Sequence, residues 1–292
     1  MLAETGLPAL EMVEATRAAV VGREREAEIV AAALAAGRNL LLEGPPGTGK
    51  TTLLRALAAG AGVGLVLVEG NAELTPARLV GHHDPSRVLT EDYRPDNFVP
   101  GPLCRAMTTG ALLYVEELNR VPEETLNVLL GVLSEREMHI PRYGVVPAAA
   151  TFRLIAAMNP YDAVGTARVS PALYDRSCRV AMRYQDESTE AAIVTRVAPG
   201  PPALVLRAVR AVQMTREHPD LRIGSSVRGA IDTVLVAAEL IAVRGEAAVS
   251  ERTGQDAART ALSGKVTVQE GCPRSVDEII EEIWIKADPG KR

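Results

Sequence analysis

The sequence has 292 residues and a net charge of -5 at pH 7, with 47% hydrophobic but only 3% aromatic residues. A chain of this length can bury the core of one α/β domain and a smaller second one, and its acidic balance argues against general attraction to nucleic acid or anionic membranes. The three cysteines lack metal-site spacing, no apolar run approaches the roughly 20 residues of a membrane span, and no signal-peptide pattern is present. We therefore expect a soluble cytoplasmic protein.

The N-terminal region has a helical pattern of apolar residues up to about Ala36, and Gly37 follows where a helix C-cap favours the left-handed backbone. A short turn at residues 20–23 precedes the second part of this pattern. An apolar run beginning at Asn39 then predicts the first buried strand.

A glycine-rich turn follows this strand and leads into another helix. Residues 44–51 fit G-x-x-x-x-G-K-[ST], the pattern of a phosphate-binding P-loop. Glycines allow backbone N–H groups to close around a polyphosphate, and the helix N-terminus adds a partial positive charge. Lys50 is placed to reach the outer phosphates, and the hydroxyl of Thr51 is placed to bind Mg²⁺.

We therefore predict that the chain binds a nucleoside triphosphate, with the turn at 20–23 as a candidate neighbour of the adenine. The alternative, a glycine-rich turn with an incidental lysine, is disfavoured by the strand before the turn and the leucine stripe after it. The predicted binding residues are Gly44, Pro45, Pro46, Gly47, Thr48, Gly49, Lys50, Thr51 and Thr52.

The next segment begins with a second strand at residues 65–68 and a short helix that starts at Thr75-Pro76. Residues 81–102 are polar and irregular in pattern, and they contain His82-His83-Asp84. Adjacent side chains rarely converge on a metal, and no further ligand has suitable spacing nearby. We interpret this region as a solvated loop that contacts a neighbour, rather than as a metal site.

A third apolar run, residues 111–115, ends in the two acids Glu116 and Glu117. Two carboxylates at the carboxyl end of a buried strand are costly unless a cation lies beside them, and Mg²⁺ bound to the nucleotide would be that cation. We expect Glu116 to hold the metal, through water, and Glu117 to polarise the attacking water. A solvated strand end is the alternative, and the upstream P-loop argues against it.

The following segment adds a helix from Pro122 and a hairpin at residues 138–151, with its tip near Tyr143-Gly144. A fourth strand at residues 153–158 ends in Asn159. The amide of Asn159 is a candidate to orient the attacking water, although an Asn-Pro pair often only turns the chain.

A short helix from Ser170-Pro171 and a fifth strand at 178–182 complete the α/β pattern, which predicts a parallel five-stranded sheet with helices on both faces. After residue 186 the strand signal disappears, and Ser275-x-x-Glu278 is a capping box ahead of the last of five helical patterns. We predict an α/β domain over residues 1–186 and a small all-helical lid over residues 187–292.

Together these residues resemble the AAA+ ATPases, and within them the MoxR branch, which also holds the CbbQ, NorQ and GvpN proteins. The resemblance covers nearly the whole chain and implies a P-loop NTPase fold with ATP and Mg²⁺ as cofactors. Residues 81–102 and 138–151 would be the helix-2 insert and the pre-sensor-1 hairpin of that clade. The matching motifs are Walker A at 44–51, Walker B at 112–117, sensor 1 at Asn159, an arginine-finger segment at 170–176 and sensor 2 at 224–228.

The resemblance also implies roles for arginines and partners. Arg176 would be an arginine finger that acts in the neighbouring subunit of a ring, hexameric in this family, with Arg179 and Arg120 as competitors. Arg228 would sense whether ATP bridges the two domains. A separate von Willebrand factor A-type protein and an unknown client protein would be partners, and nucleic acid would not. The insert and the hairpin are expected to face the client rather than to build the core.

The leading hypothesis is an ATP-hydrolysing chaperone or activase that remodels or matures a client protein. One departure supports an alternative, because the family usually has Asp-Glu at Walker B and this chain has Glu116 in place of the aspartate. The additional methylene moves the carboxylate by about 1.5 Å, which would suit a nucleotide switch or scaffold with little hydrolysis. A DNA-remodelling motor is disfavoured by the acidic balance and by the lack of a basic stripe with interleaved aromatic residues.

Overall fold

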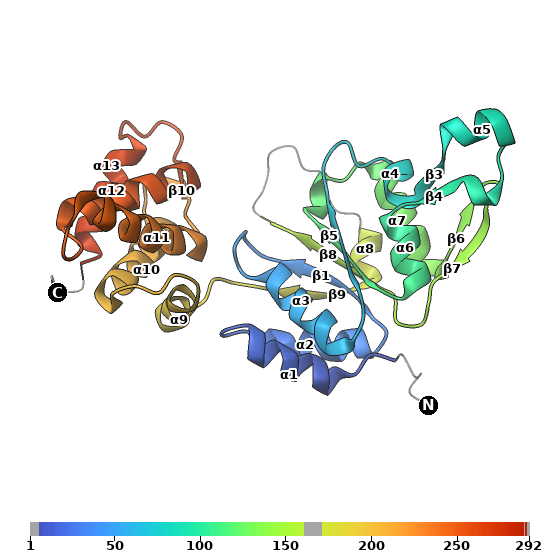
Figure 1. The fold of residues 1–292 in the computed structure, drawn as a ribbon, viewed down its shortest axis with the longest axis horizontal. Helices are drawn as coiled ribbons and strands as arrows, with labels where there is room; N and C mark the ends of the chain where they lie inside the picture. The colour runs from blue at the N-terminus through green and yellow to red at the C-terminus, as the bar shows by residue number, and fades with distance from the viewer. Residues whose placement is uncertain (1–5, 161–170, 289, 291–292) are drawn as a thin grey trace. The chain divides into compact units, whose positions relative to one another are not determined.

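The computed structural model describes residues 6–160, 171–288 and 290, and Figure 1 shows their helices and strands in chain order. The chain forms two compact units, the first ending at Arg183 and the second beginning at Tyr184, except that residues 46–48 of the glycine-rich loop group with the second unit. We call them the α/β unit and the helical unit. Within the described ranges, no helix is long and apolar enough to cross a membrane.

A parallel sheet of five strands forms the centre of the α/β unit, in the order β2-β5-β8-β1-β9. This confirms the five strands and the parallel sheet that the sequence predicts. Strands buried on both faces read as continuous apolar runs, and the three leucines of β1 are an example. The strands are β1 (Asn39–Glu43), β2 (Leu65–Glu69), β5 (Leu112–Glu116), β8 (Arg153–Met158) and β9 (Ser177–Ala181).

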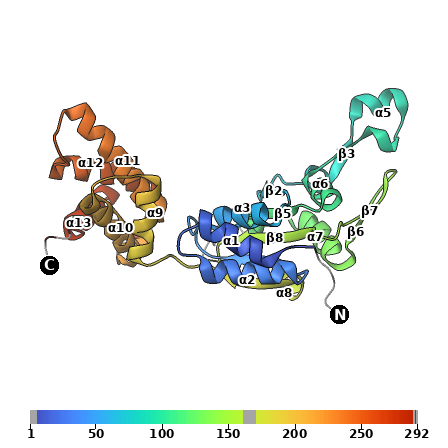
Figure 2. The same ribbon diagram turned by 60° about the horizontal axis from the view of Figure 1, so that its bottom comes forward.

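Successive leucines of β1 belong to two different cores. Leu41 packs in a core shared with α4, α6 and α7, whereas Leu40 and Leu42 pack in a core shared with α1, α2 and α3. Because side chains of a strand point alternately to its two faces, these helices cover both faces of the sheet, as Figures 1 and 2 show. The helices are α1 (Ala9–Ala19), α2 (Glu24–Ala35), α3 (Lys50–Ala61), α4 (Pro76–Val80), α6 (Pro102–Thr109) and α7 (Glu123–Glu135).

The segment at residues 81–102, which we predicted to be irregular, has regular structure instead. β3 (Gly81–His83) and β4 (Phe98–Pro100) form an antiparallel ladder, and α5 (Pro85–Glu91) and the 3₁₀ helix η1 (Pro95–Asn97) lie between them. The prediction was wrong because strands of three residues are too short to show an alternating pattern. We call residues 81–102 the insert.

The predicted hairpin is confirmed, with β6 (Glu137–Ile140) and β7 (Gly144–Pro147) joined by a turn at residues 141–143. The insert and the hairpin lie side by side in Figures 1 and 2. The expectation that they stay out of the core is wrong, because several of their apolar side chains are buried in the core that contains Leu41. These side chains are Phe98, Met138, Ile140 and Val146.

The helical unit has the five helices that the sequence predicts, and Ser275 and Glu278 form the predicted capping box. It is not entirely helical, because β10 (Leu221–Ile223) and β11 (Thr267–Val268) pair as a short antiparallel ladder that is again too short to predict. Its core includes the fully buried Trp284. The helices are α9 (Glu187–Val197), α10 (Pro202–Glu217), α11 (Val227–Arg244), α12 (Glu251–Leu262) and α13 (Val276–Lys286), with a 3₁₀ turn η3 (Ser263–Lys265).

Candidate nucleotide-binding site

The parallel sheet brings the carboxyl ends of β1, β5 and β8 to one edge. β8 lies between the other two strands, because Met158 is paired with Glu43 and Ala156 with Val115. The predicted residues that follow these three strands are therefore gathered at this edge, where open α/β sheets bind ligands. They are the P-loop, the acidic pair Glu116–Glu117 and the half-buried Asn159.

The backbone of the P-loop depends on its glycines, of which Gly47 and Gly49 are left-handed and Gly44 lies close to another segment. Gly49 has φ of 86° and is the N-cap of α3, a left-handed conformation that other residues adopt at a cost. At Gly44, a Cβ atom would lie 2.1 Å from the carbonyl oxygen of Met182. The chain can therefore turn closely from β1 into α3 only with glycine at positions 44 and 49.

The side chain of Lys50 is folded into the loop. Only 9% of Lys50 is exposed, and its Nζ atom donates hydrogen bonds of 2.9 Å to the carbonyl oxygens of Gly44 and Pro45. A cation held at the first turn of α3 adds to the partial positive charge of the helix N-terminus. The loop therefore combines the charge and backbone geometry that a polyphosphate requires.

The two predicted magnesium-binding side chains contact each other. The hydroxyl of Thr51 donates to Oε1 of Glu116 over 3.2 Å, and the hydroxyl of Tyr114 donates to the same oxygen over 3.2 Å. Burial, and then the Glu116 carboxylate, raise the pKa of Tyr114, so its hydroxyl remains a donor at neutral pH. Tyr114 was not predicted as a site residue. The signal that would have identified it is a polar aromatic residue in an otherwise aliphatic strand, two positions before Glu116.

This pair fits Mg²⁺, which prefers carboxylate and hydroxyl oxygens and usually takes its remaining ligands from phosphates and water. Within the described part of the chain, no cluster of three or more His, Cys, Asp and Glu side chains could hold a metal by itself. A metal at Thr51 and Glu116 would therefore depend on the nucleotide for further ligands.

Glu117 has an unusual backbone conformation directly after Glu116. Its φ and ψ are 51° and 45°, a left-handed conformation that costs a residue other than glycine about 1 kcal/mol. The N–H of Gly70 donates to the carbonyl oxygen of Glu116 over 2.8 Å, and a Cβ at Gly70 would lie 2.5 Å from the carbonyl oxygen of Glu117. The end of β2 therefore packs closely against this turn. Strained residues of this kind concentrate at functional sites.

The carboxylate of Glu117 is 44% exposed and forms an ion pair with Arg120 over 3.1 Å, at the end of the 3₁₀ helix η2 (Leu118–Arg120). A general base must be reached by the water from which it takes a proton, and this carboxylate is accessible to water. Arg120, one of the competing candidates for the arginine finger, contacts this carboxylate within its own chain.

An ion pair between a buried carboxylate and an exposed arginine, next to the P-loop, was not predicted. Glu43, which directly precedes Gly44, is 5% exposed, and its carboxylate accepts hydrogen bonds from Nε of Arg179 over 2.5 Å and from the hydroxyl of Tyr174 over 2.9 Å. Burial, and then the bond to Glu43, raise the pKa of Tyr174. An acid at the end of an otherwise apolar strand is the only sequence signal for this cluster.

Arg176 lies away from the other predicted site residues. It follows α8 (Pro171–Asp175) and directly precedes Ser177, which is paired with Asn39 at the amino end of β1. Gly44 lies at the other end of β1, roughly 17 Å further along at about 3.3 Å per residue. Arg176 is exposed, and its Nε atom donates to Oγ of Ser134 over 2.7 Å.

Two further predicted positions are described by the structure. Arg228 is exposed in the first turn of α11, within the helical unit. In the turn predicted near the adenine, Arg23 is 4% exposed and donates to Glu26 and to the carbonyl oxygen of Arg183 over 2.7 Å each. This turn is thus attached to the end of the α/β unit. Ser170, the start of the predicted finger segment, lies outside the described residues.

Comparisons with known proteins agree with this geometry. Residues 39–177 match the family model of the AAA domain (dynein-related subfamily), and residues 17–60 match that of magnesium chelatase, subunit ChlI. The uncharacterized protein YojN of Bacillus subtilis is 37% identical over 157 residues, which cover 52% of this chain and 50% of YojN. The uncharacterized protein SH1500 of Staphylococcus haemolyticus is 35% identical over 153 residues, 51% of this chain and 57% of that protein. The chain therefore spans about half the length of the curated relatives it matches.

Solved structures show the same fold. A protein of Cytophaga hutchinsonii that is proposed to be an ATPase has a TM-score of 0.53 at 21% identity, over 95% of this chain and 93% of that one. The Holliday junction branch migration motor RuvB of Thermotoga maritima has a TM-score of 0.55 at 16% identity, over 82% of this chain and 70% of its own. The strand order and the P-loop agree with the family match, so residues 39–177 have the α/β fold of the AAA domain whose model they match.

Proposed function

We propose that the chain binds ATP with Mg²⁺ at the carboxyl edge of the sheet and hydrolyses it. The observation that carries this proposal is the contact between Thr51 and Glu116, next to the buried ammonium of Lys50. Phosphoryl transfer depends mainly on positioning and charge stabilisation, and these three side chains suit both. The match of residues 39–177 to the AAA domain supports ATP as the nucleotide.

Each residue has a distinct proposed role. Lys50 neutralises the outer phosphates, while Thr51 and Glu116 hold Mg²⁺, which would supply charge stabilisation at the phosphates when bound. Glu117 accepts the proton of the attacking water, and Asn159 orients that water. The different partners of the two carboxylates support this separation of roles, because Glu116 is bonded to Thr51 and Glu117 is paired with Arg120.

We further propose a ring of identical subunits, hexameric as in the MoxR branch. The position of Arg176 supports this proposal, because an exposed arginine at the amino end of the sheet lies far from its own P-loop and suits the site of a neighbour. Arg228 would report from the helical unit on bound ATP. Arg179 is less suited to the finger role, since it is paired with Glu43.

The proposed biological role is that of a MoxR-type chaperone or activase, which uses ATP hydrolysis to remodel or mature a client protein together with a von Willebrand factor A-type partner. The MoxR-like motifs support this role. The insert and the hairpin support it too, because they carry exposed apolar side chains. None of these side chains belongs to the residues of the proposed nucleotide site. These side chains are Leu89, Tyr93, Val99 and Val145.

Steady-state phosphate release tests the ATPase proposal. Glu117→Gln keeps the shape of the side chain but not its basicity, so it should bind ATP and lose about 10²-fold or more in rate. Glu124→Gln, at an exposed position in the first turn of α7, is the matched control and should hydrolyse ATP normally. Normal turnover by the Glu117→Gln variant would assign the base to another group.

A second candidate function is a nucleotide switch with little hydrolysis. It is favoured by Glu116, whose side chain is one methylene longer than that of the aspartate usual at this position in the family. This longer side chain directly accepts hydrogen bonds from Thr51 and Tyr114. In that case the unmodified protein would bind ATP tightly and release phosphate no faster than its Glu117→Gln variant.

A further inference from the structure

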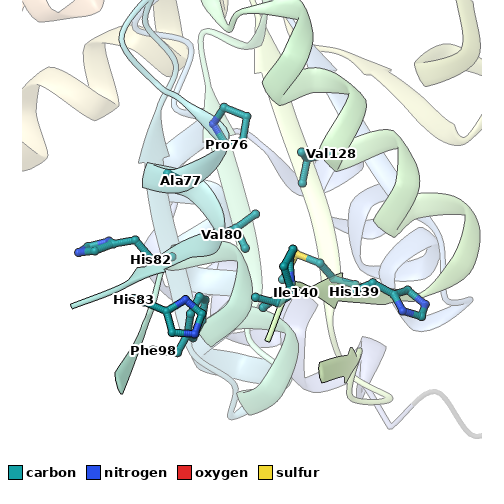
Figure 3. Close-up of a pocket in the computed structure, with 12 residues that line it drawn as sticks. Pro76, Ala77, Val80, His82, His83, Phe98, Val128, His139 and Ile140 are labelled. Atoms are coloured by element: carbon teal, nitrogen blue, oxygen red, sulfur yellow. The ribbon is translucent and has the colours of Figure 1, made fainter. Parts of the chain in front are cut away.

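Two features of the α/β unit have no part in the roles assigned above. One is an apolar pocket of about 360 Å³ that is lined by α4, the insert, α7 and the hairpin (Figure 3), and no contact among the described residues shows what would occupy it. The other is the cluster around Glu43, beside the P-loop. The contacts of this cluster connect it to the segment that carries the proposed arginine finger.

We propose that Glu43 is a positioning residue for Arg176, the proposed arginine finger. Its carboxylate holds the segment that carries Arg176 in the place from which this arginine reaches the site of a neighbouring subunit. The inference rests on the proposed ring and on the finger role of Arg176. It assigns to a residue beside one P-loop an effect on ATP hydrolysis in the next subunit.

The carboxylate of Glu43 is bonded to residues on both sides of Arg176. Its Oε1 atom accepts a hydrogen bond from the hydroxyl of Tyr174 over 2.9 Å, and its Oε2 atom accepts one from Nε of Arg179 over 2.5 Å. Tyr174 lies in α8, two residues before Arg176, and Arg179 lies in β9, three residues after it. One side chain at the end of β1 therefore holds the chain before and after Arg176.

The side chain of Arg176 is itself oriented by α8. Its Nη1 atom donates to the carbonyl oxygen of Ala172 over 3.1 Å, and its Nε atom donates to Oγ of Ser134 over 2.7 Å. Ala172 and Tyr174 belong to the same helix of five residues. Because so short a helix is marginally stable by itself, contacts such as the bond from Tyr174 to Glu43 determine where it lies. A shift of α8 would move both the backbone and a bonding partner of Arg176.

The P-loop does not depend on the carboxylate of Glu43 for its own position. Backbone groups hold the entry to the loop, because the N–H of Gly44 donates to the carbonyl oxygen of Met158 over 3.1 Å and the N–H of Met182 donates to that of Glu43 over 2.7 Å. A negative charge beside a loop that binds polyphosphate is also unfavourable for the ligand. The carboxylate is therefore better explained by its bonds to the segment around Arg176.

Glu43→Leu removes both bonds and is the first variant to test. Leucine suits this buried position, which follows three leucines in β1. The side chain of Arg179 is 56% exposed and Tyr174 is 40% exposed, so both can exchange the lost bonds for bonds to water. The variant should therefore fold, which urea unfolding checks. If it does not fold, Tyr174→Phe replaces it in every measurement below, since this variant changes only one exposed hydroxyl bond.

Binding and hydrolysis should respond differently to Glu43→Leu. Calorimetric titration should give a Kd for ATP within about two-fold of the unmodified value. Phosphate release should be slower by about 10-fold to 10²-fold, since a displacement of about 1 Å in an active site can cost 10²-fold in rate. Tyr174→Phe should show the same pattern to a smaller degree.

Two further variants are controls for these measurements. Glu43→Gln keeps one acceptor oxygen, so it should recover part of the rate that Glu43→Leu loses. Glu28→Gln removes the carboxylate of an exposed ion pair with Arg17 on the surface of the same unit. It should bind and hydrolyse ATP as the unmodified chain does.

Mixed rings show in which subunit Glu43 acts. Glu117→Gln subunits lack the base but keep the finger, whereas Arg176→Ala subunits lack the finger but keep the base. Glu43→Leu subunits, with an intact site and a misplaced finger, should recover hydrolysis when mixed with Glu117→Gln subunits and not when mixed with Arg176→Ala subunits. Recovery with Arg176→Ala subunits would place the defect in the site of the Glu43→Leu subunit itself and overturn the inference.

The mixture of Glu117→Gln with Arg176→Ala subunits is the reference, because it tests the proposed ring and finger alone. Recovery in this reference but in neither mixture with Glu43→Leu would overturn the inference and leave the proposed function intact, and so would normal hydrolysis by Glu43→Leu rings. No recovery in reference rings that mass measurements show to be mixed would remove the finger role of Arg176 and this inference with it. Phosphate release by the unmodified chain would then still support the proposed ATPase.

Discussion

Arg179 and Glu43 form an ion pair at the end of β1, with Nε of Arg179 2.5 Å from Oε2 of Glu43. Glu43 is buried beside the first residue of the P-loop, whereas more than half of the Arg179 side chain is exposed. A buried carboxylate needs a cationic or hydrogen-bonding partner, and this arginine and Tyr174 fulfil that need. Arg179 is therefore engaged within its own subunit, and Arg176 is the better candidate for a residue that acts on a neighbour.

Arg176→Ala should lower ATP hydrolysis by about 10³-fold or more if Arg176 is the finger of the adjacent site. Arg179→Ala should instead lower the free energy of unfolding by about 1–3 kcal/mol, because it leaves the carboxylate of Glu43 buried with one partner fewer. Phosphate release and urea unfolding of both variants check these outcomes.

Mixed rings provide the control. Rings of Arg176→Ala and Glu117→Gln subunits contain some interfaces with an intact base from one variant and an intact finger from the other. Phosphate release should then exceed that of either variant alone. No recovery in rings that mass measurements show to be mixed would remove Arg176 from the finger role.

Lys50→Ala should abolish ATP binding, because the buried ammonium is the cation that the loop presents to the phosphates. Calorimetric titration with ATP measures the loss. Lys286→Ala, which removes an exposed lysine from α13, is the control and should bind ATP normally. Micromolar affinity in the Lys50→Ala variant would contradict the assigned role.

Glu116→Gln should weaken the Mg²⁺ dependence of ATP binding, since an amide is a poorer ligand for a hard cation than a carboxylate. Tyr114→Phe removes one hydrogen bond to Glu116 but leaves its charge, so it should lower stability by about 1 kcal/mol and retain the Mg²⁺ dependence. Titration of Mg²⁺ at fixed ATP distinguishes the two variants. Identical Mg²⁺ curves for Glu116→Gln and the unmodified chain would place the metal elsewhere.

Acid should destabilise the helical unit through Glu282. Lys286, and then Arg274, lower the pKa of Glu282 from its ordinary 4.5 to about 2. Because the folded-state pKa is the lower one, the ionised carboxylate stabilises the fold above pH 4.5, and this contribution is lost as the pH falls from 4.5 towards 2. Glu282→Gln should therefore be less stable than the unmodified chain at pH 7, and the difference should shrink at pH 3.

Urea unfolding at the two pH values measures this difference. Glu281→Gln, an exposed neighbour on α13, should show the same pH dependence as the unmodified chain. A Glu282→Gln variant with an undiminished stability difference at pH 3 would show that the ion pairs of Glu282 do not stabilise the fold.

Much of the fold was predictable because its signals are local. Continuous apolar runs identified the five strands, and the glycines and Lys50 identified the P-loop. The β3–β4 and β10–β11 ladders were not predictable, because two or three residues cannot show alternation. Packing of Tyr143 against Phe98 was also missed, since it joins segments with no shared pattern.

The candidate site also contains residues that local signals predicted and residues that they did not. Thr51 and Glu116 were predicted to share a metal, and the structure places them in contact. The partners Tyr114, Tyr174 and Arg179 were missed in these roles, because a hydrogen bond between distant segments leaves no periodic trace in the chain.

The position of β1 between two strands that come much later in the chain has a consequence for how the protein is made. β1 is paired on one side with β8 and on the other with β9, so it has no strand partner until residue 158 has been synthesised and one unpaired edge until residue 181 has been synthesised. About 140 residues separate Glu43 from Ala181, which corresponds to roughly 7–28 s at a ribosomal rate of about 5–20 residues per second. During that interval an exposed strand edge is prone to aggregation. The nascent chain therefore passes through a vulnerable period before it can hold a nucleotide, and slower translation would lengthen that period.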